Sequence, residues 1–445
     1  MEHNLTKGNL LKTIIYFSLP YFLSYFLQTL YGLADLFIIG QFCGVEATTA
    51  VTVGSQIMHM LTVMIVGLAM GATVMIGRSV GANDKKACAK YIGNTATLFM
   101  LVSICATAVL LILTKVILRA VNTPGEAFSQ AQSYLTICFI GVPFITAYNI
   151  ISAIFRGLGD SKSPMYFIAI SCAANIALDY LFIGALGLGS AGAALGTALS
   201  QTISVIFSLF FIKRSKSSIK LCKSDFRLAK PTVSKLVKIG LPVSLQDGLI
   251  QISFLVITAI ANSRGLNDAA AVGIVEKIIG ILFLVPSTML STVSAVSSQC
   301  VGAKMHERAK NTLKYGIIIN FIWGLMCVLF MHFFARQTVS LFTQSQEVAV
   351  LGQQYMAGYV YDCIIAGTHF CFSGYFCAYG LSQASFFHNV ISTFCARIPL
   401  AYLASVNFPD TLTPMGIATT LGSSVSVFIC IAIYIYMQKK KIKST

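Results

Sequence analysis

Charged residues are scarce in this 445-residue chain: Asp, Glu, Lys and Arg together make up 10% of it, and only one tryptophan occurs. Hydrophobic residues make up 56%, and the mean hydropathy is +0.79. No hydrophilic segment is long enough to form a soluble domain. The composition therefore excludes an ordinary water-soluble protein and indicates a polytopic membrane protein that is surrounded by the lipid bilayer.

Sequence signatures of metal, nucleotide and hydrolytic sites are also missing. The 13 cysteines show no CxxC or zinc-type spacing, the six histidines form no HExxH, and no GxxxxGK[ST] loop is present. Gly187, Gly189 and Gly192 spell GxGxxG, but they join two apolar segments instead of opening a βαβ unit. We therefore expect no enzymatic activity, no cofactor or structural metal, and no ATP-driven pump within this chain.

The net charge of +16 is explained by membrane topology, so it gives no reason to expect a nucleic-acid partner. Of the 31 basic residues, 25 lie in the termini and in the loops that share their side of the membrane, and four lie in the opposite loops. This bias predicts a multi-pass protein of the cell (inner) membrane with both termini in the cytoplasm.

Twelve apolar segments are each long enough to cross a bilayer, which takes roughly 20 residues in a helix. They are predicted at residues 14–39, 53–77, 91–114, 131–155, 164–184, 190–212, 238–262, 271–297, 312–335, 350–377, 386–406 and 413–437. The predicted fold class is thus an all-α integral membrane protein with twelve transmembrane helices.

The two halves of the chain resemble each other. SLPYFLS at 18–24 is similar to GLPVSLQ at 240–246, and SVGANDKKACAKY at 79–91 is similar to CVGAKMHERAKNT at 300–312. We predict an N-terminal six-helix bundle over 1–215, a basic cytoplasmic linker over 216–237 and a C-terminal six-helix bundle over 238–445. Two such pseudo-symmetric bundles around a central cleft can open to alternate sides, which indicates a transporter that is expected to be monomeric.

A carboxylate interrupts the first apolar stretch. Ser24, Gln28, Tyr31 and Asp35 recur at helical spacing and form one polar stripe. An ionisable group facing lipid costs at least a few kcal/mol, so this stripe is expected to face other helices or a wet cavity. Pro20, in the same segment, removes a helix hydrogen bond and marks a place where the helix can bend.

Further polar residues are predicted at the same depth as Asp35. Asn175 and Asp179 share one face of the fifth segment, and Thr197 lies about two turns inside the sixth. Such oxygen-rich sets suit a hard cation such as Na⁺. They also suit protons, because two carboxylates in a dry site cannot both ionise easily. A static polar plug that holds three helices together remains the alternative.

The second half has its own polar residues within the spans. Asp247 and Gln251 share a face, whereas Asp362 and Arg397 both fall near mid-span and could pair, either as a structural pair or as part of the transport cycle. Acidic groups outnumber basic ones within the spans, which favours small lipophilic or cationic organic substrates. The residues predicted to contact substrate are Gln28, Tyr31, Tyr148, Asp247, Gln251 and Asp362.

Four segments carry a resemblance to a known family: LADLFIIGQFCG (33–44), RGLGDSKSP (156–164), NIALDYLFIGALGLGSAGAALGTALSQ (175–201) and GLP of the second half (240–242). At these residues, and over essentially its whole length, the chain resembles the MATE (multidrug and toxic compound extrusion) family of cation-coupled antiporters. The resemblance to the branch with a cation site in the N-terminal bundle implies ion-handling roles for Asp35, Asn175, Asp179 and Thr197. It also implies a helix-bending role for Pro20 and a cavity position for Gln28.

Other branches of the family use a glutamate in the seventh span, which aligns near Ile250; this chain has Asp247 almost one turn earlier. The expected function is secondary active multidrug efflux in exchange for H⁺ or Na⁺ by alternating access. A flippase for lipid-linked oligosaccharides of similar architecture is the alternative. A flippase would need several intramembrane basic groups to hold pyrophosphate, whereas only Lys277 and Arg397 lie within the predicted spans.

Overall fold

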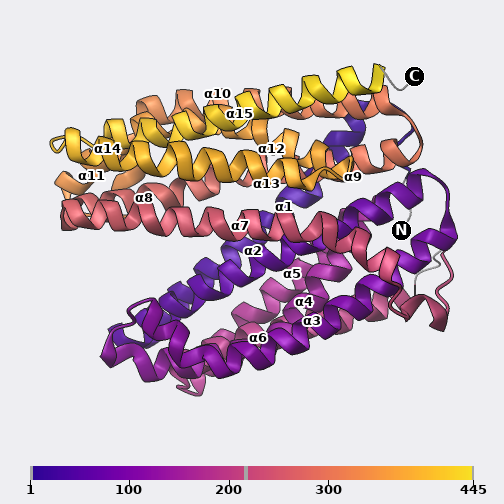
Figure 1. Cartoon of the computed structure of the whole chain (residues 1–445). Helices are drawn as coiled ribbons and strands as arrows, with labels where there is room; N and C mark the ends of the chain where they lie inside the picture. The colour runs from indigo at the N-terminus through magenta and orange to yellow at the C-terminus, as the bar shows by residue number, and fades with distance from the viewer. Residues whose placement is uncertain (1–3, 215–218, 443–445) are drawn as a thin grey trace. The chain divides into compact units, whose positions relative to one another are not determined.

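The computed structural model describes residues 4–214 and 219–442, and no β-strand occurs within those two ranges. The first half is built from α1 (Leu10–Phe42), α2 (Val45–Gly81), α3 (Lys85–Ala120), α4 (Gly125–Gly157), α5 (Lys162–Asp179), the π-helix η1 (Tyr180–Ala185) and α6 (Gly189–Arg214). The α-helices are labelled in Figure 1. A short 3₁₀ turn, η2 (Lys223–Phe226), precedes the second half.

The second half begins with α7 (Lys230–Arg264). It continues with α8 (Leu266–Leu282), α9 (Leu284–Gly302), α10 (His306–Ser340), α11 (Gln346–Tyr359), α12 (Asp362–Ala378), α13 (Ser382–Ile391), the π-helix η3 (Ser392–Arg397), α14 (Ile398–Asn407) and α15 (Thr413–Ile442).

The expected transmembrane segments are all helical. Eleven stretches of the described chain, some of them built from two or three successive helices, are long and apolar enough to cross a membrane. The remaining predicted segment, 350–377, is split between α11 and α12 at Val360 and Tyr361, so that each part is shorter than a full span. The predicted twelve-helix, two-bundle fold is confirmed.

Two compact units divide the described chain. The first comprises residues 4 and 5 and Tyr16–Gly240, and the second comprises Thr6–Ile15 and the chain from Leu241 onward. The change of unit therefore falls inside the continuous helix α7. Residues 215–218 lie outside the described residues, so the domain limits of 215 and 238 remain predictions.

In the first unit, α4 packs against α2, α3 and α6, and α5 packs against α6. The side chains between these helices form a dry core that includes Ile38, Val51, Leu118, Phe139 and Ala194. Packing of helices around α4 brings the ends of α1, α5 and α6 into the region where the polar residues of the first unit lie.

In the second unit, α12 packs against α9, α10 and α15, and α11 packs against α8, α10 and α15. The Arg308 guanidinium donates hydrogen bonds to the main-chain carbonyls of Lys7 (3.0 Å) and Gly8 (2.9 Å). These two bonds explain why the residues just before and at the start of α1 group with the second unit.

Candidate ion site and substrate-contact residues

The side chain of Asp35 is the centre of a polar cluster in the first unit. It lies in the last two turns of α1 and is 4% exposed. The Thr197 hydroxyl on α6 donates to Asp35 Oδ2 over 3.3 Å. Asp179 and Asn175, both fully buried on α5, interact electrostatically with the same carboxylate. The structure therefore brings together the four predicted ion-handling residues from three helices.

Gly196 allows α5 and α6 to approach each other at this cluster. A Cβ atom at position 196 would collide with Asp179 Oδ1 and would lie 3.5 Å from Asn175 Nδ2. The carboxylate and the amide thus rest against bare backbone, where any side chain would displace them. In the sequence, Gly192 and Gly196 form a GxxxG pattern, which predicts close helix packing here, and Gly196 directly precedes Thr197.

Several polar atoms of the cluster have no hydrogen-bond partner. Both oxygens of Asp179, Oδ1 of Asp35 and both amide atoms of Asn175 are buried and unpaired. The groups that act on the two carboxylates are each other, Asn175 and Thr197, and no Lys or Arg is among them. Within the described residues, the one salt bridge joins Arg264 and Asp268, which both belong to the second unit.

An unpaired, oxygen-rich set of this composition fits a small hard cation. Carboxylate, amide and hydroxyl oxygens are the donors that such ions take, and orphaned buried oxygens are satisfied when an ion or a shared proton binds. The donor set contains neither sulfur nor imidazole, so it does not favour zinc or another transition metal.

The remaining predicted residues of α1 lie beside or below this cluster. The Tyr31 hydroxyl is buried and interacts with Asp35, Thr197 and Ser200, which places it within the ion cluster. Gln28 is half-buried, one turn earlier. Pro20 sits inside the uninterrupted α1.

Tyr148 lies in a different environment. It is buried in an apolar cluster with Phe155, Phe167 and Val205, against which Leu27 of α1 packs. Its surroundings are those of a packing residue in this conformation, and its contact with substrate remains a prediction.

In the second unit, Asp247 and Gln251 are half-buried on α7, whereas Asp362 is 1% exposed at the start of α12. The pairing considered for Asp362 and Arg397 does not form as a direct ion pair. Arg397 instead donates a hydrogen bond to the Tyr359 hydroxyl over 2.7 Å. Its interaction with Asp362 is a longer-range electrostatic attraction. The Tyr359 hydroxyl thus accepts the hydrogen bond from Arg397 that the Asp362 carboxylate was considered for.

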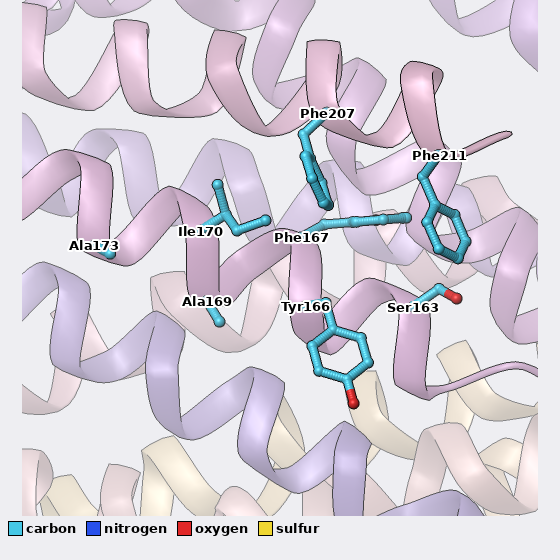
Figure 2. A pocket seen from close by; sticks show the side chains of 8 residues that line it. All are labelled: Ser163, Tyr166, Phe167, Ala169, Ile170, Ala173, Phe207 and Phe211. Atoms are coloured by element: carbon cyan, nitrogen blue, oxygen red, sulfur yellow. The ribbon is translucent and has the colours of Figure 1, made fainter. Parts of the chain in front are cut away.

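An apolar groove of about 380 Å³ lies on the first unit between α5 and α6. Figure 2 shows its lining, which consists of Ser163, Tyr166, Phe167, Ala169, Ile170, Ala173, Phe207 and Phe211. None of the residues predicted to contact substrate lines this groove. Its aromatic and aliphatic surface is typical of a membrane protein face that contacts lipid chains.

Buried carboxylates inside a duplicated bundle of membrane-spanning helices define the class of ion-coupled membrane transporters. The family model MatE matches residues 20–181 and 242–403, which is more than half of the chain. The chain belongs to the MATE family, whose members are transporters that use ion gradients and are not enzymes.

Two curated relatives and one solved structure illustrate the similarity. The chain is 30% identical to "Probable multidrug resistance protein YpnP" of Bacillus subtilis, over 98% of this chain and 96% of the relative. It is 23% identical to "Multidrug export protein MepA" of Staphylococcus haemolyticus, over 95% and 94%. A structure described as the outward-facing conformation of a multidrug resistance MATE family transporter matches the fold with a TM-score of 0.92 at 24% identity, covering 99% and 98% of the two chains.

Proposed function

We propose that this protein exports lipophilic or cationic organic compounds from the cytoplasm in exchange for H⁺ or Na⁺, with Asp35, Asn175, Asp179 and Thr197 binding the ion. It does so in the cell membrane, with both termini in the cytoplasm. The names of its relatives support multidrug export.

One observation carries the proposal: two neighbouring buried carboxylates have no basic partner within the described parts of the chain. Two negative charges in a low-dielectric interior are strongly unfavourable unless a cation or proton joins them. A purely structural polar plug would be expected to pair its oxygens with donors, yet both oxygens of Asp179 are unpaired. The cluster is therefore best suited to gaining and losing a positive charge.

Ion binding can drive transport only if it favours one conformation of the protein over the other. Neutralising the Asp35–Asp179 pair removes the repulsion between α1 and α5, so the ion-bound and ion-free clusters favour different packing of these helices. One charge crossing about 100 mV supplies roughly 2.3 kcal/mol. A tenfold concentration gradient adds about 1.4 kcal/mol.

The experiment is uphill ethidium extrusion in membrane vesicles, with proton and sodium gradients imposed separately. The wild-type protein is expected to extrude ethidium with one or both gradients. Asp35→Asn keeps the size and polarity of the side chain but removes its charge, and it is expected to abolish extrusion under every gradient. Retention of wild-type extrusion by this variant rules the ion site out.

Asp84→Asn is the matched control. Asp84 is also an aspartate of the first unit, but it is exposed and caps the N-terminus of α3, where it accepts a hydrogen bond from Ala87 N over 2.9 Å. Asparagine also caps helices well. This variant is therefore expected to extrude ethidium as the wild type does.

A further inference from the structure

The second unit contains a buried cation of its own, the guanidinium of Arg397. This residue ends the π-helix η3, whose extra residue per turn re-aims side chains. Its Cζ lies 4.8 Å from the centroid of the Phe254 ring and 5.7 Å from that of Tyr359. With the 2.7 Å hydrogen bond to the Tyr359 hydroxyl, two ring faces and one oxygen hold the guanidinium.

Two carboxylates surround this aromatic pair at longer range. Glu276 on α8 and Asp362 on α12 both act electrostatically on Arg397, and neither is in salt-bridge contact with it. Glu276 Oε1, Asp362 Oδ1 and Arg397 Nε are buried and without hydrogen-bond partners. Two carboxylates and one guanidinium thus lie in one region of the second unit without forming a salt bridge.

The corresponding part of the first unit differs in charge. The two matches to the family model cover 20–181 and 242–403, so α7 and the helices from α13 to α14 correspond to α1 and α5. In these helices the second unit carries Arg397, whereas Ile257 and Ala401 are fully buried in its apolar core.

We propose that Phe254, Tyr359, Glu276 and Asp362 form a second cation site, specific for a planar guanidinium group, and that Arg397 is its permanently tethered occupant. In the corresponding helices the first unit has acids that bind an exchangeable ion, whereas the second unit carries its positive charge on a side chain. The second unit therefore takes up no coupling ion at Arg397, an aspect that rests on the proposed function of the first unit.

The chemistry of the pocket supports this class of occupant. Aromatic faces attract planar, weakly hydrated cations more effectively than they attract a compact ammonium group, and Arg is accordingly the basic residue that stacks best. Removing the guanidinium leaves two carboxylates without a counter-charge in a buried region, which is strongly destabilising. A free guanidinium ion that enters the vacated space restores the charge, the stacking and the hydrogen bond to Tyr359.

The experiment uses purified Arg397→Ala in detergent and in vesicles, with guanidinium chloride and urea as probes at low millimolar concentration. Urea has nearly the same planar shape but no charge. The substitution is expected to lower ethidium efflux about tenfold or more, equivalent to 1.4 kcal/mol. Guanidinium is expected to restore this efflux and to raise the unfolding temperature of the variant. Urea is expected to do neither, and the wild type, whose site is filled, should respond to neither probe.

Three results overturn the proposal: unimpaired efflux by Arg397→Ala, equal rescue by urea, or a folded variant that guanidinium does not stabilise. If the alanine variant does not accumulate, Arg397→Gln with guanidinium present during purification provides the same reading through the yield of folded protein. The unfolding temperature does not depend on transport. It therefore tests the guanidinium site independently of the ion site proposed at Asp35.

Discussion

Corresponding helices carry different charges in the two units. In the first, the buried carboxylates of Asp35 and Asp179 have unpaired oxygens and no basic partner among the described residues. In the second, the corresponding helices are apolar at Ile257 and Ala401 and carry the buried cation Arg397. The comparison teaches that the helices of the repeat are alike while the charge within them differs, which matches the proposed ion exchange in the first unit and a fixed cation in the second.

Placing an acid in the apolar position of the second unit tests this contrast most severely. Ile257→Asp buries a carboxylate among Ala261, Val275 and other residues of the hydrophobic core. We expect a loss of about 3–5 kcal/mol in the free energy of unfolding, the penalty of an unpaired buried charge. Ile257→Val, measured alongside by thermal unfolding in detergent, should lose about 1 kcal/mol. Equal stability of both variants would mean that the second unit tolerates an acid there.

The reverse exchange in the first unit is expected to separate stability from transport. Asp35→Leu removes one of two repelling buried charges. The free energy of unfolding should therefore stay the same or rise by about 1–3 kcal/mol. Ion-driven ethidium efflux should nevertheless vanish, because the ion loses a ligand. A marked fall in the unfolding temperature would show that Asp35 is a structural group, and the contrast between the units would then fail.

Gly196→Ala tests the close approach of α5 and α6 at the ion cluster. The added methyl group collides with the Asp179 carboxylate, so the donor set is displaced and efflux should fall about tenfold, equivalent to 1.4 kcal/mol. Gly273, in the middle of α8, has nothing within 4 Å of the corresponding Cβ position. Gly273→Ala should therefore leave efflux unchanged and stabilise its helix by about 0.5–1 kcal/mol. Equal effects of the two substitutions on efflux would remove Gly196 from the account.

The smallest effect on ion-coupled transport is expected for Tyr359→Phe in the second unit. This change keeps the ring under the guanidinium but removes the hydroxyl that accepts its hydrogen bond. A loss of about 1–3 kcal/mol in the free energy of unfolding is expected, as for a charged donor left unsatisfied, with ion selectivity unchanged. A change in the coupling ion of this variant would contradict the assignment of ion exchange to the first unit alone.

Much of the fold could be predicted from the sequence, because length and hydropathy determine where a membrane helix lies. The convergence of Asp35, Asn175, Asp179 and Thr197 could also be anticipated, since depth in the bilayer follows from the distance to the helix ends. The interruption between α11 and α12 could not, because neither proline nor glycine stands at Val360 and Tyr361 to mark the break. Nor could the partner of Arg397, which depends on the rotation of α11 about its axis and on the π-helix η3.

The most direct test is to count the charge that the protein exchanges. Purified protein in weakly buffered detergent solution is loaded with ethidium, and the protons released or taken up, and the Na⁺ bound, are measured for the wild type and for Asp179→Asn. The account predicts that ethidium changes the number of bound H⁺ or Na⁺ in the wild type and leaves it unchanged in the variant. An equal change in both proteins would contradict an exchange site built on Asp35 and Asp179.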